Sequence, residues 1–169
     1  MTLEKENKYK RLYMDIAHRV AQMSYAKRLL VGAIIVKDGR ILSMGFNGMP
    51  AGWDNNCEDK IYSDTDTETG YEYPYKEYLG EFGDVVRHYR LKTKPQVLHG
   101  EMNCMMKLAR SNESSEGADL FLTHSPCMVC AKAIYQSGIR RLYFGKHYRD
   151  NAGIEFLEKS GVEVENFSD

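Results

Sequence analysis

The sequence predicts an α/β fold, a three-layer α/β/α sandwich with a central mixed five-stranded sheet. Two strand-like segments joined by a short turn lie in the first half of the chain, and three more alternate with helical segments after residue 98. Such alternation packs helices on both faces of a sheet and makes the later strands parallel. The length of 169 residues suits a single domain, spanning 1–169, that buries its own core.

The first half of the chain starts with a predicted helix over residues 8–27. Its apolar residues recur at helical spacing and share one face: Leu12, Ile16, Val20 and Met23. The strand-like segments 31–36 and 40–46 then flank the turn sequence Lys37-Asp38-Gly39, which predicts a hairpin. The loop 46–52 contains glycine and proline, and its backbone can approach a ligand closely.

Residues from about 53 to 98 have no clear periodicity and are rich in Asp, Glu, Thr and Tyr. We interpret this segment as an insertion into the domain. Packing of its many tyrosines explains it more simply than a specific functional role does.

Helices and strands alternate regularly in the rest of the chain. The predicted helices cover residues 101–110, 127–137 and 154–159, and the predicted strands cover 119–123, 141–145 and 162–166. Gly138 follows the second of these helices, in the position where glycine commonly ends a helix.

Composition excludes several classes of protein. The net charge is −1, so the chain lacks the positive field with which nucleic-acid polymer binders gather phosphates, although a local basic spot still suits a small anion. No segment is long and apolar enough for a membrane span, and the N-terminus does not resemble a signal peptide. We therefore expect a cytoplasmic protein without a membrane or nucleic-acid polymer partner, whose four cysteines are metal ligands or buried thiols.

Three residues have the spacing of a metal site. Cys127 and Cys130 lie on one side of a first helical turn, where unpaired N–H groups favour thiolates. His99 adds a nitrogen at the start of the preceding helix, and one nitrogen with two sulfurs suits tetrahedral zinc. Three protein ligands leave a fourth place for water, as in catalytic zinc sites. Cys104 is the alternative fourth ligand, but it lies roughly 140° around the helix from His99.

Glu101 follows closely after His99 and is not needed as a ligand. It can take a proton from the attacking water and deliver it to a ring nitrogen and then to departing ammonia, as hydrolytic deamination requires. The simpler interpretation is a carboxylate that stabilises the dipole of a helix N-terminus. A thioredoxin-like role for the C-x-x-C sequence leaves His99 and Glu101 unexplained. The combination of H-x-E with P-C-x-x-C is instead the signature of zinc-dependent nucleobase deaminases.

Three longer segments carry a wider resemblance. They are VGAIIVKDGRILSMGFNGMPAG (31–52), HGEMN (99–103) and THSPCMVCAKAIYQSGIRRLYF (123–144). They resemble the cytidine/deoxycytidylate deaminase superfamily, and most closely its deoxycytidylate (dCMP) deaminases, including those of bacteriophages. The resemblance implies a cytidine deaminase-like fold and conversion of dCMP and water into dUMP and ammonia for thymidylate synthesis. For a phage protein it implies the host cytoplasm as the location.

The resemblance also implies which residues hold the base and sugar. Asn47 would contact the deoxyribose 3′-hydroxyl or the phosphate region, and the backbone N–H of Gly100 would bind the pyrimidine O2. Ser125 is a further expected substrate contact, and Tyr148 would line the pocket. The family usually has alanine where this chain has Gly100, and glycine loosens the helix start.

For the phosphate, the resemblance points to Ser24, Lys27 and Arg28, which precede the first strand. Lys27 and Arg28 equally suit a solvated helix end, where their charge would complement the helix dipole.

Similar enzymes are commonly hexamers that dCTP activates and dTTP inhibits. The resemblance places the effector near Gly48, Pro50 and Gly52, between subunits, with Mg2+ as an expected companion of the bound triphosphate. Some phage relatives bind a second, structural zinc through a cysteine where this chain has Ala26. Cys57 and His88 remain as partial ligands, so we expect one catalytic zinc ion and disfavour a second site.

Two alternative functions stay open. A tRNA or single-stranded DNA deaminase shares the zinc chemistry but needs a basic, aromatic-lined channel. A non-catalytic interaction module stapled by zinc would have no need of Glu101. The chemistry of the motifs is the same for dCMP and for other cytosine nucleotides.

Overall fold

The central sheet has five strands in the order β2-β1-β6-β7-β8, in a computed structural model that describes residues 2–80, 83 and 85–167. The strands are β1 (Gly32–Lys37), β2 (Arg40–Phe46), β6 (Asp119–His124), β7 (Arg141–Lys146) and β8 (Glu163–Asn166). β1 pairs with β2 and with β6 in antiparallel fashion, whereas β6, β7 and β8 are parallel. The predicted mixed five-stranded sheet is confirmed.

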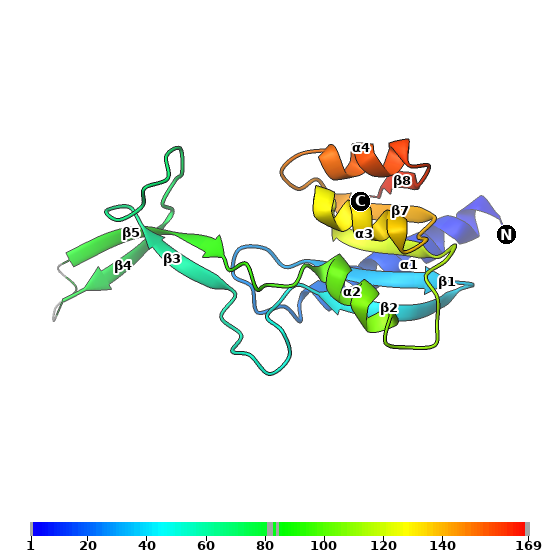
Figure 1. Cartoon of the computed structure of the whole chain (residues 1–169), viewed down its shortest axis with the longest axis horizontal. Coiled ribbons are helices and arrows are strands. Elements are labelled where there is room, and N and C mark those ends of the chain that lie inside the picture. Colours follow the sequence, from blue (N-terminus) through cyan, green and yellow to red (C-terminus); the bar gives the residue numbers. More distant parts are fainter. Residues whose placement is uncertain (1, 81–82, 84, 168–169) are drawn as a thin grey trace.

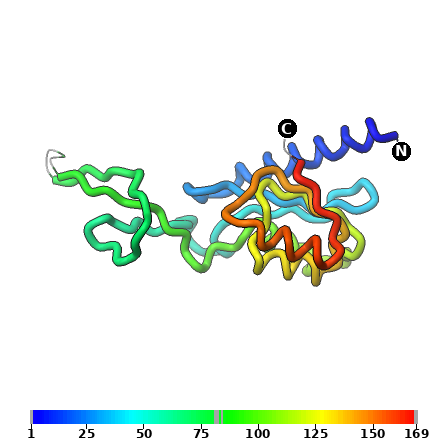
Figure 2. The backbone as a smooth tube through the Cα atoms, turned by 90° about the horizontal axis from the view of Figure 1, so that it is seen from above, coloured from blue at the N-terminus to red at the C-terminus, as the bar shows by residue number. Residues whose placement is uncertain are grey.

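Helices cover both faces of this sheet, which confirms the three-layer sandwich (Figure 1). They are α1 (Leu3–Ala21), α2 (Gly100–Leu108), α3 (Met128–Gln136) and α4 (Ala152–Lys159). Figure 2 shows α1, in blue, along one side of the sheet and the yellow to red helices along the other. No helix within the described residues combines the length and the hydrophobicity that crossing a lipid bilayer requires.

The core has two halves because residues on successive positions of a strand point to opposite faces. In β1, Ala33 and Ile35 pack in the cluster beneath α2, α3 and α4, whereas Ile34 and Val36 pack against α1. β1 is therefore buried on both sides. A tight turn joins it to β2 through Asp38 and Gly39, which both have positive φ angles of 51° and 75°. This conformation is typical of two-residue hairpin turns.

α1 differs from its prediction in its bounds and in part of its buried face. It begins at Leu3 because the Thr2 hydroxyl accepts a hydrogen bond from the N–H of Lys5, and it ends at Ala21 rather than near residue 27. Of the four residues predicted to share one apolar face, Ile16 and Val20 pack against the sheet, whereas Leu12 and Met23 are 48% and 62% exposed. The buried residues of the helix are Tyr13, Met14, Ala17, Val20 and Ala21.

Close packing against β1 explains this choice of face. A Cβ atom on Gly32 would lie only 2.1 Å from the carbonyl oxygen of Ala17, so the helix and the strand touch through their backbones. Small residues are needed at such a contact, and the leucine and methionine of the predicted stripe do not fit there.

The predicted insertion contains a second sheet, which projects from the sandwich as an arm (Figure 1). Its order is β3-β5-β4, all antiparallel, with β3 at Glu58–Tyr62, β4 at Tyr75–Leu79 and β5 at Val85–Thr93. We call these three strands and their connections, residues 58–93, the arm. The sequence analysis predicted no strands in this segment, and the division of the chain into one domain with an insertion at 53–98 stays a prediction.

Rings and ion pairs hold the arm together. Tyr89 lies between two other rings, with its centroid 5.8 Å from that of Tyr62 and 5.4 Å from that of Tyr75. Arg90 pairs with Asp66 at 2.6 Å and with Glu68 at 2.7 Å. Because these contacts replace a hydrophobic core, the strands lack the alternation of apolar residues that marks a half-buried sheet. The tyrosine packing that the composition suggested is present.

Candidate active site

The candidate metal ligands come from two helix N-termini that meet at one end of the sheet. His99 is the N-cap residue of α2, and Cys127 is the N-cap residue of α3. Neither side chain makes a capping hydrogen bond to its own helix, so the imidazole and the thiol are directed elsewhere. Cys130 lies in the first turn of α3 and is buried.

These three side chains have the spacing of zinc ligands. Their ligand atoms all lie within 4.8 Å of one another, and they form the one group of this kind found among the described residues. His99 Nδ1 is 3.3 Å from the sulfur of Cys130 and 3.7 Å from that of Cys127. Two ligands of a tetrahedral zinc ion, with Zn–N near 2.0 Å and Zn–S near 2.3 Å, would be roughly 3.5 Å apart. The residues therefore fit the ion.

The three side chains of this cluster differ in how their pKa values are shifted. The Cys127 thiol has a pKa lowered to about 3, first because Cys130 donates a hydrogen bond to it and then because His99 does. The pKa of Cys130 is raised because its proton is shared with the Cys127 thiolate. The contact with Cys127 likewise raises the pKa of His99. A cluster that competes for protons in this way is suited to a cation that replaces them.

Glu101 lies in the first turn of α2 beside this cluster. It is 4% exposed and lines the same cavity as His99 and Cys127. Burial raises the pKa of its carboxyl group, against the opposing effects of hydrogen bonds and of His99. A carboxylate with a raised pKa is a stronger proton acceptor than one in water, which suits a general base.

The cavity beside the cluster has a volume of about 410 Å³. The residues predicted from sequence that line it are Arg28, Asn47, His99, Gly100, Glu101, Ser125, Cys127 and Tyr148. Ser24, Lys27 and Cys130 do not line it. Cys130 is buried beside His99 and Cys127 as a candidate ligand, whereas Ser24 and Lys27 are absent from the lining of the space where a substrate would lie.

Asn47 and Ser24 shape the cavity wall through hydrogen bonds. The Asn47 side chain accepts from the N–H of Val31 at 2.8 Å and donates to the carbonyl of Leu29 at 2.8 Å. Ser24 donates its hydroxyl to the Asn47 carbonyl at 2.6 Å. Ser24 therefore supports Asn47, and Asn47 fixes the segment that enters β1.

Tyr148 is anchored by Ser125, whose hydroxyl accepts a hydrogen bond from the Tyr148 N–H at 2.8 Å. Gly100 packs on Val31, so closely that a Cβ atom at Gly100 would lie 3.0 Å from the Val31 carbonyl oxygen. Glycine in place of the family's usual alanine matches this tight contact.

Several lining residues were missed by the sequence analysis: Glu58, Thr93, His124, Lys146, His147 and Arg149. His124 and Lys146 end the parallel strands β6 and β7. Ligands of open α/β sheets bind beyond the carboxyl ends of parallel strands, so the predicted strand ends could have indicated these two. Glu58 and Thr93 belong to the arm, and no sequence signal connects them with the site.

The three residues predicted to bind effectors, Gly48, Pro50 and Gly52, do not line the cavity, whereas the neighbouring Asn47 does. Gly48 exchanges two backbone hydrogen bonds with Leu98, and the Trp53 N–H donates to the Pro50 carbonyl in a turn. Gly52 has a φ angle of 87°, which favours glycine in this turn.

The remaining cysteines and His88 lie away from the cluster. Cys104 is in the main core, where burial raises the pKa of its thiol to about 11. Cys57 is packed with Ala26 and Val97 in a small apolar cluster. His88 lies in β5, opposite Lys76 of β4.

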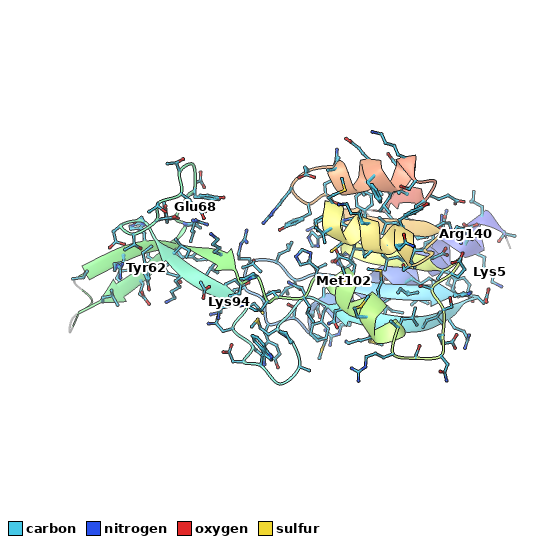
Figure 3. All side chains as sticks on the ribbon, in the orientation of Figure 1. Lys5, Tyr62, Glu68, Lys94, Met102 and Arg140 are labelled. Atoms are coloured by element: carbon cyan, nitrogen blue, oxygen red, sulfur yellow. The ribbon has the colours of Figure 1, made fainter. Side chains whose placement is uncertain are left out.

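A second cavity, of about 590 Å³, lies between α1 and the starts of β6 and β7. Lys5 and Arg140, which line it, are at the end of the molecule away from the arm (Figure 3). It is larger than the cavity beside Glu101, but the three clustered ligands do not line it. The chemistry therefore points to the smaller cavity.

Comparisons with known proteins agree with this site. The family model described as "Cytidine and deoxycytidylate deaminase zinc-binding region" matches residues 7–146. The deoxycytidylate deaminase of Enterobacteria phage T4 is 34% identical over 168 residues, covering 90% of this chain and 86% of that protein. The ComE operon protein 2 of Bacillus subtilis is 29% identical and covers 90% of this chain and 68% of its own length.

A solved structure is also similar over nearly the whole chain. The dCMP deaminase of cyanophage S-TIM5, in complex with dCMP and dUMP, superposes with a TM-score of 0.72 at 38% identity and covers 99% of both chains. The profile match, the phage relatives and the geometry of the His/Cys/Cys group lead to one conclusion: this chain belongs to the cytidine and deoxycytidylate deaminase zinc-binding family.

Proposed function

We propose that this chain hydrolyses dCMP to dUMP and ammonia. The observation that carries the proposal is the buried carboxylate of Glu101 in one cavity with His99 and Cys127, at a cluster whose spacing fits zinc. The relatives named deoxycytidylate deaminase and the neighbour solved with dCMP and dUMP supply the substrate.

In this proposal His99, Cys127 and Cys130 hold one zinc ion, which when bound acts as a Lewis acid towards the attacking water. Glu101 accepts the proton that the water loses. It then returns that proton to the pyrimidine ring nitrogen and delivers the next one to the departing ammonia. Because Glu101 is buried, bulk water does not compete for these protons.

The pyrimidine is held at the start of α2. The first four N–H groups of a helix have no partner within the helix, and Gly100 is the first residue of α2. Its N–H is therefore suited to donate a hydrogen bond to the pyrimidine O2. Tyr148 supplies a ring to the same cavity, and Ser125 fixes its backbone.

Two arginines suit the phosphate. Arg28 and Arg149 both line the cavity, and neither forms an ion pair with a carboxylate of the described residues. The Arg149 guanidinium lies 5.0 Å from the ring of Tyr148, and its backbone has a φ angle of 55°. Guanidinium groups bind phosphate through paired, charge-assisted hydrogen bonds. The net charge of −1 leaves little attraction for a longer nucleic acid.

A substrate panel tests the proposal. Ammonia release by the zinc-containing protein is measured with dCMP, deoxycytidine, CMP, dCTP and a short cytosine oligonucleotide. We expect kcat/KM for dCMP to exceed that for deoxycytidine by about 100-fold, since a desolvated charged contact contributes about 2 to 5 kcal/mol. Arg149→Met should remove much of this preference. Turnover of the oligonucleotide alone, or equal turnover of deoxycytidine and dCMP, would overturn the proposal.

The finer properties that the resemblance implies are also proposals. We infer a hexamer with dCTP as activator and dTTP as inhibitor, each accompanied by Mg2+ and bound near Gly48, Pro50 and Gly52. Gly48, Pro50 and Gly52 do not line the substrate cavity, so an effector bound to these three residues would not compete directly with dCMP. Rate curves that do not change with added dCTP or dTTP would contradict regulation.

A cytoplasmic location, in the host for a phage protein, is consistent with the four cysteines being free thiols. Fractionation of expressing cells would test it. In that compartment the reaction would supply dUMP for thymidylate synthesis.

A further inference from the structure

The arm reaches into the wall of the substrate cavity at its base. Glu58 is the first residue of β3 and Thr93 the last residue of β5, and the two are paired across the antiparallel ladder. Both line the cavity beside Glu101. Lys94, which follows Thr93, lies where the chain passes from the arm to the sandwich (Figure 3).

Glu58 is a buried carboxylate that binds backbone rather than a cation. It is 5% exposed, and its Oε1 accepts hydrogen bonds from the N–H of Lys27 at 3.0 Å and of Arg28 at 3.2 Å. Within the described residues no ion pair joins Glu58 to a basic side chain. The carboxylate of Glu58 therefore positions the main chain at Lys27 and Arg28.

Thr93 holds the other end of the same arginine. Its Oγ1 accepts a hydrogen bond from Nη1 of Arg28 at 2.9 Å. Arg28 is thus fixed by the arm at both its backbone and its guanidinium. A threonine hydroxyl is neutral, and no ion pair joins Arg28 to a carboxylate of the described residues, so the charge of its guanidinium is available to an anionic substrate.

The segment 27–31 forms no helix or strand and depends on side chains at both ends. Asn47 binds Leu29 and Val31 at one end, and Glu58 binds Lys27 and Arg28 at the other. We call residues 27–31 the strap. Removing the side chain of Asn47 or of Glu58 would leave the strap with side-chain hydrogen bonds at one end only.

We infer that Glu58 is a positioning residue through which the arm sets the preference for a phosphorylated substrate. It acts through Arg28, whose guanidinium it places at the cavity with the help of Thr93. The inserted segment is then a wall of the active site as well as a peripheral sheet. This inference rests on the proposed function, in which Arg28 contacts the substrate phosphate.

Four variants of the full-length, zinc-containing protein test the inference: Glu58→Ala, Glu58→Gln, Thr93→Val and Asp59→Asn. For each, kcat and KM are measured with dCMP and with deoxycytidine, and zinc content is determined. Glu58→Gln keeps an oxygen acceptor, and Thr93→Val keeps the β-branched shape that suits the strand. Asp59→Asn is the matched control, because Asp59 is the adjacent residue of β3, its side chain is 58% exposed, and its ion pair, with Lys94 at 3.7 Å, does not involve Arg28.

We expect Glu58→Ala to raise KM for dCMP about tenfold, the effect of misplacing one charged contact. Its kcat and its KM for deoxycytidine should stay within about threefold of the unmodified protein. Glu58→Gln should restore most of the loss, Thr93→Val should raise KM for dCMP alone by about threefold, and Asp59→Asn should change nothing.

Other outcomes would overturn the inference. Equal effects of Glu58→Ala on dCMP and deoxycytidine would show a general structural role, and unchanged KM values would show no role. If Glu58→Ala does not fold, Thr93→Val and Glu58→Gln decide, and an unchanged KM for dCMP in Thr93→Val would contradict the inference. Failure of the unmodified protein to deaminate dCMP would instead defeat the proposed function and this inference with it.

Discussion

His99 and Glu101 reach the same cavity although two residues of one helix start normally point in different directions. His99 precedes the helix, with extended φ and ψ angles of −71° and 148°, whereas Glu101 lies in the first helical turn. The change of backbone conformation between them turns both side chains towards the cysteines of α3. This geometry is what the H-x-E spacing encodes.

Replacing Glu101 with glutamine tests its role in proton transfer. Glu101→Gln keeps the size of the side chain but removes the proton acceptor, so kcat for deamination should fall by at least about 100-fold. Zinc content and thermal stability should stay close to those of the unmodified protein, because the ligands are untouched. Activity within a few-fold of normal would assign the proton transfer to another group.

A pair of cysteine variants tests which thiols bind zinc. Cys130→Ala should lose the zinc ion, whereas Cys104→Ala should retain one equivalent. Cys104 is fully buried in the core, so its truncation should lower the free energy of unfolding by about 1 kcal/mol. Metal analysis with thermal unfolding measures both effects, and loss of zinc from Cys104→Ala would mean that the fourth position is filled by protein.

The sequence could group those site residues whose positions short motifs determine. His99, Cys127 and Cys130 could be grouped because each lies at a helix start whose position local sequence fixes. Glu58 could not be, because its contact with Lys27 and Arg28 spans about 30 residues and depends on how the arm folds back.

Among the elements, α1 shows why periodicity alone identified only part of the buried face, Ile16 and Val20. Tyr13 is an amphipathic residue whose hydroxyl donates to the Gly39 carbonyl at 3.1 Å while its ring packs on Phe121. Ala17 is chosen for its small size against Gly32. Tyr13 and Ala17 are less hydrophobic than Leu12 and Met23. The apolar spacing in the sequence therefore included Leu12 and Met23, which are exposed, and missed Tyr13 and Ala17, which are buried.

The packing of α2 on β2 affects the position of Gly100 and Glu101, because both residues belong to α2. A Cβ atom on Gly45 would lie 2.4 Å from the backbone N of Cys104. Gly45→Ala should therefore push α2 away and lower the free energy of unfolding by about 1 to 3 kcal/mol, with a loss of activity.

The matched control for this variant is Gly48→Ala, where the added Cβ would lie 3.9 Å from the nearest atom. Denaturant unfolding should distinguish the two. Equal stability of Gly45→Ala and Gly48→Ala would contradict the close packing of α2 on β2.

Acid should loosen the arm before it unfolds the sandwich. The hydrogen bond from Arg90 lowers the pKa of Asp66 from its ordinary 3.8 to about 2. A carboxyl group with a lowered pKa stabilises the fold above its unfolded pKa, and that contribution is lost as the pH falls through its folded pKa. Amide NMR signals of β5 should therefore shift between about pH 4 and 2 ahead of those of β6, and Asp66→Asn should abolish this difference.

The whole molecule combines a sandwich that the sequence predicts well with an arm that it does not. The strands of the sandwich are apolar and buried, as in β1, so composition and turn residues reveal them. The arm is held by tyrosines and by ion pairs such as Arg90 with Asp66, whose polar sequence resembles that of an irregular loop. Its strands become visible only when residues far apart in sequence are paired.

Arg28 lies at the cavity that also contains Glu101 and the candidate metal ligands His99 and Cys127, and the arm contacts it there through Glu58 and Thr93. The sandwich thus supplies the reacting groups, and the arm supplies the anchors of the strap. This division explains why local motifs could group His99, Cys127 and Cys130, whereas the contacts of Glu58 and Thr93 with Arg28 could not be predicted from sequence.

Zinc titration of the metal-free protein, followed by dUMP formation from dCMP, tests zinc-dependent deamination most directly. Activity should rise in proportion to added zinc and reach its plateau at one equivalent per chain, in a protein that retains Glu101. Full activity without zinc, or a plateau that requires a further equivalent, would show that a single zinc ion does not carry the reaction.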